Sequence, residues 1–309
     1  MNYAFQVDSS DVRSVYEKND NYLVELNLSS EDLLERSCAI YFSSHGIYYP
    51  NTSAVFERKI VLQDYYEWKK NKIKNIEKHI FLRDVFKQWY IKGINSRLPD
   101  IESVLSFLQE ECKDSKTIIT VGSSAGGYAA VLFGSLLKAD KIYCFNGQLS
   151  LERQLLKAEE LENPILLRER ERLLHSSYLN LEAVIRESKV DIFYFNSANS
   201  KIDQLHLSIA KLHPNVHTFI FKTNVHRIPF YLFNLSSVLN SRKERLLECS
   251  SKIPMSKFEF SVQLEGYWKT VWLMFLRVLG LLKSVPQAIN QRFFRVSLKE
   301  NCGLRSKIS

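Results

Sequence analysis

The sequence is poor in the residues that mark fibrous, low-complexity and disulfide-rich chains. Its 309 residues include only 10 glycines, 7 prolines and 5 cysteines. Such low counts exclude a collagen-like repeat, a Pro/Gly-rich disordered chain and a disulfide scaffold. What is present is 45% hydrophobic residues beside 25% charged residues, the balance of a globular chain with a core. The length fits two average domains or one large α/β domain.

The five cysteines are far apart, odd in number and without a Cys-x-x-Cys pair. This spacing favours a reducing compartment and argues against a structural zinc site, so we expect no metal. The first twenty residues lack the basic start and the apolar core of a secretory signal. We therefore predict a cytoplasmic protein.

The positive charge is confined to the end of the chain. From residue 251 onward, ten lysines and arginines stand against three acids, which accounts for +7 of the total formal charge of +8. The first 250 residues are therefore nearly neutral. This division predicts a main domain of residues 1–250 and a basic tail of residues 251–309.

Short runs of β-branched and aromatic residues predict the strands of a sheet. We expect strands at residues 37–44, 58–64, 79–84, 117–121, 141–145, 190–196 and 216–222. Apolar residues at helical spacing predict helices at 101–112, 125–137 and 227–247. Because strands and helices alternate, the sequence predicts an α/β fold with a mainly parallel sheet and helices on both faces.

Residues 149–186 are helical in pattern, heavily charged and placed between two predicted strands. A helical insertion that caps a site explains this pattern. A solvated crossover helix explains it equally well.

The motif with the clearest chemistry is Gly-Ser-Ser-Ala-Gly at residues 122–126, a G-x-S-x-G between a buried strand and a small-residue helix. In this context the motif predicts the nucleophile elbow of an α/β-hydrolase-like fold, with Ser124 as nucleophile. Its glycines relieve crowding at a strained turn. The alternative is a phosphate-binding turn, but the sequence has neither the Gly-Lys-Ser/Thr of a Walker loop nor a G-x-G-x-x-G.

A serine nucleophile needs a base, and the base needs an orienting acid, in the chain order Ser, Asp/Glu, His. Asp203 follows a predicted strand and is the candidate acid. Its rival Asp191 begins that strand and so lies at the wrong edge. His226 directly follows the last predicted strand and is the candidate base. The other histidines considered, at earlier points in the chain, are His206, His213 and His217.

An oxyanion hole needs two N–H donors. One is predicted to be the N–H of Ala125, and the other to come from Ser44, His45 and Gly46, which follow an early strand. His45 itself is expected to brace the loop. Trp89 and Tyr90 follow another strand at the same edge of the sheet and are candidates to stack on a sugar or a pantetheine chain. Packing in a helix core explains them equally well.

Three stretches together resemble a known family. YFSSHG at residues 41–46, FLRDVFKQWYIKGI at 81–94 and TVGSSAGGYAAVLFG at 120–134, followed by a late Asp and His, resemble bacterial surface-polysaccharide O-acetyltransferases of α/β-hydrolase fold. The resemblance covers roughly residues 37–235 and leaves the tail unexplained.

The resemblance implies a Ser–Asp–His triad of Ser124, Asp203 and His226 that takes acetyl from acetyl-CoA and passes it to a capsule sugar hydroxyl. Acetyl-CoA is then a co-substrate, a polysaccharide is the acceptor, and no cofactor is tightly bound. Transfer through an acetyl-serine requires that water be kept from the second step, which a cap at residues 149–186 could do.

Residues 266–283 are strongly apolar but interrupted by Lys269 and Arg277, so a membrane-spanning helix is not expected. The preferred interpretation is a basic amphipathic helix on an anionic membrane surface, anchored by Trp268, Trp272 and Phe275. Such a protein would be peripheral on the inner face of the cytoplasmic membrane. Packing against the domain, a second subunit or capsule-assembly proteins is the alternative. The charge comes with no recognition motif, so no nucleic acid is expected.

Three functions therefore remain open. The first is an acetyl-CoA-dependent O-acetyltransferase acting on a capsular or related glycan. The second is a serine esterase or deacetylase with the same triad. The third is a non-catalytic component of a glycan export or assembly machinery, which would keep its function after a Ser124→Ala substitution.

Overall fold

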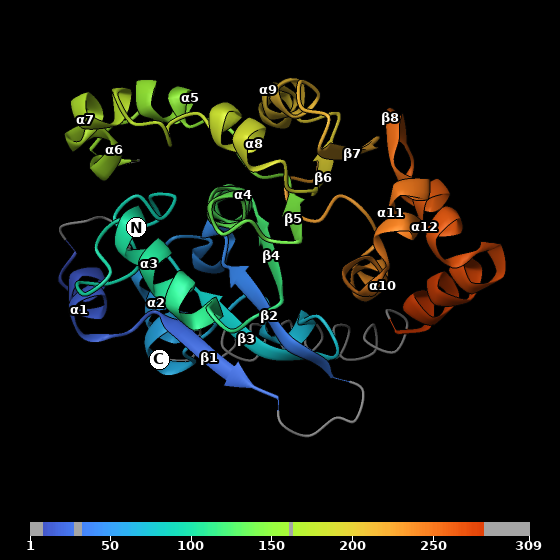
Figure 1. Ribbon diagram of the computed structural model, residues 1–309, viewed down its shortest axis with the longest axis horizontal. Coiled ribbons are helices and arrows are strands. Elements are labelled where there is room, and N and C mark those ends of the chain that lie inside the picture. Colours follow the sequence, from blue (N-terminus) through green and yellow to red (C-terminus); the bar gives the residue numbers. More distant parts are fainter. Residues whose placement is uncertain (1–8, 28–32, 161–162, 281–309) are drawn as a thin grey trace, which may run out of the picture.

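Eight strands form one sheet in the described residues, and all neighbouring pairs but one run parallel. The computed structural model describes residues 9–27, 33–160 and 163–280. The strands are β1 (Tyr22–Leu26), β2 (Leu34–Phe42), β3 (Ile76–Leu82), β4 (Thr117–Ser123), β5 (Lys141–Phe145), β6 (Ile192–Ser197), β7 (Val216–Phe221) and β8 (Ser251–Met255). Their order across the sheet is β1-β3-β2-β4-β5-β6-β7-β8, with β1 antiparallel to β3 (Figure 1).

Helices cover both faces of this sheet, and each face has its own hydrophobic core. One face packs against α3 (Ile101–Cys112), α4 (Ala125–Leu136), α8 (Glu182–Ser188) and α9 (Lys201–Ala210). The other packs against α10 (Leu235–Asn240), α11 (Lys243–Cys249) and α12 (Lys257–Glu265). The short helices α1 (Ser10–Lys18) and α2 (Ser53–Phe56) belong to a third, smaller cluster. Helices on both faces of a mainly parallel sheet confirm the predicted fold class.

The predicted insertion is a chain excursion between β5 and β6. It contains α5 (Glu152–Leu156), α6 (Pro164–Arg168), α7 (Arg170–Leu174) and α8. An isolated antiparallel bridge joins Ser150 to Asn180, so the excursion leaves and returns at one point. Its outer part packs on the loop after β3, where the N–H of Leu166 donates to the side chain of Gln88 at 3.1 Å.

Two predicted elements take another form in the structure, and strands β1 and β8 were not predicted. Residues 58–64 are not a strand, because Glu57–Leu62 form a π-helical turn in which only Ile60 is buried. Three adjacent apolar residues are too few to separate a short strand from a helical turn. The single helix expected at 227–247 is two short helices, α10 and α11, after an irregular segment that contains Pro229.

The sheet continues past the predicted domain boundary at residue 250. Strand β8 pairs in parallel with β7, and Phe260 of α12 is fully buried against Phe219 and Phe221. Residues 251–265 are therefore part of the α/β domain, and the described part of the chain that projects from it begins after Gly266. The remainder of the predicted tail, residues 281–309 with Cys302, lies outside the described residues.

Four cysteines are described, Cys38, Cys112, Cys144 and Cys249, and all four are free and buried. Their burial among apolar residues of the two cores is that of small hydrophobic side chains.

A buried histidine in the sheet should make stability depend on pH. Burial, with a smaller contribution from Lys72, lowers the pKa of His79 to about 4. The unfolded chain then binds a proton that the folded chain does not between about pH 6.5 and 4, so stability falls as the pH falls through this window. Between pH 7.5 and 5.0, the wild type should lose about 2 kcal/mol more free energy of unfolding than His79→Gln.

Urea unfolding at the two pH values measures this difference. The exposed His175→Gln variant is the control and should lose as much stability as the wild type. Equal losses in the wild type and in His79→Gln would contradict the assignment.

Candidate active site

Ser124 lies on a strained turn between β4 and α4, with φ of 52° and ψ of −121°. A non-glycine residue with positive φ is uncommon and persists only where the surroundings enforce it. The enforcement comes from two close backbone approaches. A Cβ at Gly122 would lie 1.9 Å from the carbonyl oxygen of Gly126, and a Cβ at Gly126 would lie 2.2 Å from that of Phe42. Only glycine fits at either position, so strand, turn and helix pack tightly enough to expose the serine.

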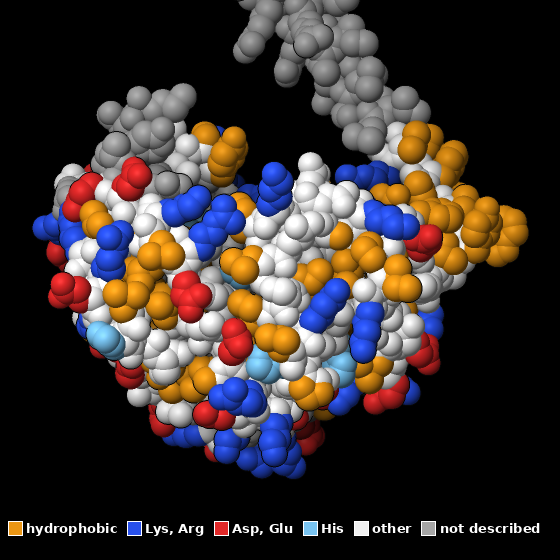
Figure 2. Space-filling view, turned by 90° about the horizontal axis from the view of Figure 1, so that it is seen from above, with side chains coloured by type: hydrophobic (Ala, Val, Ile, Leu, Met, Phe, Trp, Pro, Cys, Tyr) orange, Lys and Arg blue, Asp and Glu red, His pale blue; other side chains and the backbone are white. Residues whose placement is uncertain are grey.

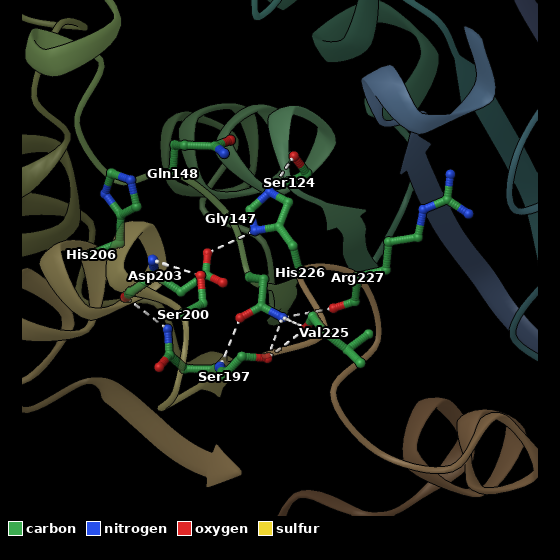
Figure 3. Close-up of polar contacts among 12 residues, drawn as sticks. Ser124, Gly147, Gln148, Ser197, Ser200, Asp203, His206, Val225, His226 and Arg227 are labelled. Atoms are coloured by element: carbon green, nitrogen blue, oxygen red, sulfur yellow. Dashed lines mark hydrogen bonds and ion pairs between the residues drawn. The ribbon is translucent and has the colours of Figure 1, made fainter. Parts of the chain in front are cut away.

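The candidate base reaches this serine directly. The Oγ of Ser124 lies 2.9 Å from the Nε2 of His226, which follows β7 (Figure 3). The Nδ1 of the same ring lies 2.8 Å from the Oδ1 of Asp203. A carboxylate at Nδ1 favours the tautomer in which Nε2 accepts the serine proton. The arrangement can therefore deprotonate the hydroxyl and stabilise the imidazolium that results.

Asp203 is held in place by the start of α9. It lies in the first turn of the helix, and its N–H donates to the side chain of the N-cap residue Ser200. The carboxylate is fully buried, and its Oδ2 has no hydrogen-bond partner among the described residues. Its one hydrogen bond is thus directed to His226, which is the geometry of an orienting acid.

A buried asparagine, which the sequence did not single out, fixes the loop that carries the base. Asn146 follows β5, and its Nδ2 donates to the carbonyl oxygens of Val225 and Arg227, on either side of His226, at 3.1 and 2.8 Å. Its Oδ1 accepts from the N–H of Ser197 at 2.8 Å. One amide therefore ties the ends of three strands together around the imidazole.

The predicted oxyanion donors are only partly open. Ala125 is the first residue of α4, so its N–H has no acceptor within the helix. The N–H of Ser44 instead donates to the carboxylate of Glu67 at 2.6 Å, and that of Gly46 to the hydroxyl of Ser44 at 3.2 Å. The N–H of His45 has no acceptor among the described residues. The geometry thus favours Ala125 and His45 over Ser44 and Gly46.

Glu67 and Arg227 hold the loop of residues 44–46 in place. Burial raises the pKa of Glu67, while its bonds to Ser44 and the charge of Arg227 oppose that rise. The guanidinium of Arg227 donates to the carbonyl oxygen of Gly46 at 2.9 Å. The residue after the base is therefore bonded to the loop that presents the second oxyanion donor.

The two aromatic residues proposed for substrate stacking are buried in the protein. Tyr90 is fully buried, and its hydroxyl donates to the carbonyl oxygen of Ser43, so its ring is unavailable to a ligand. Trp89 donates from Nε1 to Gln148 at 3.2 Å and packs edge-on against His45. Burial lowers the pKa of His45, as suits a bracing side chain. These residues therefore support the loop of residues 43–46, which Trp89 contacts at His45 and Tyr90 at Ser43.

The other candidate acids and bases make their hydrogen bonds to residues outside the triad, although His206 lies near Asp203 (Figure 3). Asp191 pairs with His217 at 2.7 Å, at the ends of β6 and β7 where the strands begin. His206 is buried and its Nδ1 accepts from the N–H of Leu149 at 3.3 Å, while burial lowers its pKa to about 4. His213 is likewise mostly buried. Among the described residues, no group of three or more His, Cys, Asp or Glu side chains could hold a metal ion.

A cleft of about 650 Å³ lies beside the elbow. Its lining includes Ser123, Val225 and Arg227, the chain neighbours of Ser124 and His226. Its walls are mostly aromatic and aliphatic, and Lys257 and Arg277 add two further cations. A pocket of this size, with apolar walls and a few charged groups, can hold a small organic ligand.

No known family model matches the chain, and no curated protein matches its sequence. Among solved structures, it is similar to the 2,6-dihydroxy-pseudo-oxynicotine hydrolase (12% identity, TM-score 0.43), with 66% of this chain and 58% of that chain covered. It is also similar to the capsule O-acetyltransferase of Neisseria meningitidis serogroup A (16%, 0.46; 65% and 83% covered). A third is ferulic acid-bound Est1E from Butyrivibrio proteoclasticus (10%, 0.47; 74% and 94% covered).

The chain thus spans little more than half the length of the first of these proteins. At these identities and TM-scores, the likenesses carry no argument about activity. The α/β-hydrolase fold is assigned on this chain's own features, which are the mainly parallel sheet, the helices on both faces and the elbow after β4.

If the hydrogen-bonded geometry activates Ser124, the serine should react covalently with a fluorophosphonate probe. Ser124→Ala should abolish labelling of the protein. Asp203→Asn, which favours the wrong tautomer, should slow labelling by about 10⁴-fold, and His226→Ala by at least as much. Mass spectrometry of the labelled peptide and time courses test this. The exposed Ser208→Ala is the control, and undiminished labelling of Ser124→Ala would refute the assignment.

Asn146→Asp tests the bracing of the base loop with a side chain of the same shape. The substitution puts a carboxylate oxygen against the carbonyl oxygens of Val225 and Arg227, and the repulsion should displace His226. Because a displacement of about 1 Å lowers rates by about 10²-fold, probe labelling should slow by that factor. His79→Gln, a substitution on β3, controls for a general loss of stability. A folded Asn146→Asp protein that labels at the wild-type rate would contradict the bracing role.

Proposed function

We propose that the protein is an O-acetyltransferase that moves acetyl from acetyl-CoA to a hydroxyl of a capsular or other surface polysaccharide. The observation that carries the proposal is the continuous hydrogen-bonded chain from Ser124 through His226 to Asp203. The acetyl donor and the glycan acceptor rest on the resemblance of residues 41–46, 81–94 and 120–134 to that family. We propose the cytoplasm as its location.

In the first half-reaction, His226 takes the hydroxyl proton of Ser124 as the oxygen attacks the thioester carbonyl. The tetrahedral oxyanion lies at the N terminus of α4, where the N–H groups of Ala125 and His45 donate to it. Collapse breaks the carbon–sulfur bond, and the imidazolium returns its proton to the departing thiolate. The products are acetyl-Ser124 and free CoA.

In the second half-reaction, the neutral His226 takes the proton of an acceptor hydroxyl as that oxygen attacks the acetyl-enzyme. The same two N–H groups hold the second oxyanion. Collapse releases the acetylated sugar, and the imidazolium reprotonates Ser124. Asp203 keeps the imidazole in place in both half-reactions. The same residues therefore form acetyl-Ser124 in the first and break it down in the second.

The cleft beside the elbow supports a CoA thioester as donor. The three cations Arg227, Lys257 and Arg277 line it together with one acid, Glu67, and with aromatic and aliphatic walls. Cations suit phosphate groups, and apolar walls suit a pantetheine chain. A simple acetyl ester has no phosphate group that these three cations could bind.

One observation favours a serine esterase as the second candidate. The side chain of His226 is 40% exposed, so water can approach the base in the second step. The helices α5–α7 contact the loop after β3, where the N–H of Leu166 donates to the side chain of Gln88. The outcome is hydrolysis when water reaches His226 first, and transfer when an acceptor hydroxyl does.

Incubation of the purified protein with radiolabelled acetyl-CoA, without acceptor, tests the proposal. The wild type should retain about one label per chain and release free CoA, whereas Ser124→Ala should do neither. Cleavage of p-nitrophenyl acetate without labelling from acetyl-CoA would favour the esterase. Inactivity in both assays, with function in cells surviving Ser124→Ala, would favour a non-catalytic component.

A further inference from the structure

The described chain ends in an exposed apolar helix. After Gly266, residues 267–280 are helical and project from α12 (Figure 1). Eight large hydrophobic side chains of this helix are exposed, and Figure 2 shows hydrophobic side chains gathered on a projection at the upper right. They are Tyr267, Trp268, Val271, Trp272, Phe275, Leu276, Val278 and Leu279.

This concentration differs from the scattered apolar residues of an ordinary surface. Trp268 is 82% exposed and Trp272 is 57% exposed, although tryptophan is usually well buried. Large contiguous apolar surfaces mark sites that bind a protein or a membrane. The helix contacts the domain along one side, where Thr270 is fully buried and its hydroxyl bonds that of Ser261 at 3.0 Å, and Arg277 lines the cleft beside the elbow.

The charge around this helix identifies the kind of partner. Lys257 and Arg277 have no carboxylate partner among the described residues, and Lys269 pairs with Glu265 at its root. Beyond Gly266, the sequence has eight lysines and arginines and one acid. A second copy of the chain would bring this positive charge against itself, whereas an anionic surface would neutralise it.

We propose that helix 267–280 docks the protein on an anionic lipid bilayer. Tryptophan and tyrosine prefer the membrane–water boundary, and a helix with apolar and cationic groups lies in that plane. No described helix is long and apolar enough to cross the bilayer. Arg277 of this helix also lines the cleft beside the elbow, so docking sets the cleft mouth at the lipid surface. The proposal does not depend on the chemistry at Ser124.

Flotation of the full-length protein with vesicles tests the docking. The wild type should bind vesicles of 30% phosphatidylglycerol and 70% phosphatidylcholine more tightly than vesicles of phosphatidylcholine alone. Two of the four tryptophans, Trp68 and Trp89, are buried, so a blue shift of tryptophan emission on binding reports on Trp268 and Trp272. The double variant Trp268→Ser/Trp272→Ser should lose at least about tenfold in affinity, and Arg277→Gln about fivefold.

Two control variants match these changes elsewhere on the surface. Leu156→Ser, on α5, removes an exposed apolar side chain, and Lys116→Gln, before β4, removes an exposed charge. Both should bind vesicles like the wild type. Equal affinity for anionic and neutral vesicles, or full binding by the tryptophan variant, would overturn the proposal. So would a dimer in light scattering that the tryptophan variant converts to a monomer, because the helix would then be an interface between copies.

Discussion

The close contact of β4, α4 and β2 at two glycines is the constraint on which the site depends. Gly122 and Gly126 allow backbone atoms to approach where any side chain would collide. Only then can the turn hold Ser124 at a positive φ, with its hydroxyl presented to His226. The strain at the serine is therefore supported by the packing of the whole sheet centre rather than by the turn itself.

Three segments that follow strands supply the candidate triad, and parallel strands explain why they meet. Ser124, Asp203 and His226 each follow the carboxyl end of a strand, and in a parallel sheet these ends share one edge. Asn146 follows β5, which lies between β4 and β6 in the sheet. It fixes the position of His226 at this edge, because its side chain donates to the carbonyl oxygens on both sides of that residue. Long-range order in the site thus comes from strand register and one buried amide.

The sequence predicted what depends on local pattern and chain order. The elbow residues, the central strands and the chain order of Asp203 and His226 all leave such a pattern, and the structure brings these side chains together. The sequence could not reveal the bond of Glu67 to Ser44. The two residues are 23 positions apart, and no local pattern marks a glutamate as the partner of a distant loop. Strand β8 was missed because Ser251–Met255 contains charge and proline and has only one buried residue. The sequence left Tyr90 open between packing and stacking, because aromatic residues at a sheet edge serve both.

The bridge between Ser150 and Asn180 has a consequence for how such a protein can diversify. The chain of α5–α7 enters and leaves the domain at this one bridge, and none of the triad residues lies within it. Because the two ends of the excursion meet at this bridge, its length can change over generations without altering the spacing of Ser124 and His226. Its buried side chains Leu155, Leu166 and Leu173 belong to the same core as α3 and α4, so change in its sequence is left to its exposed residues.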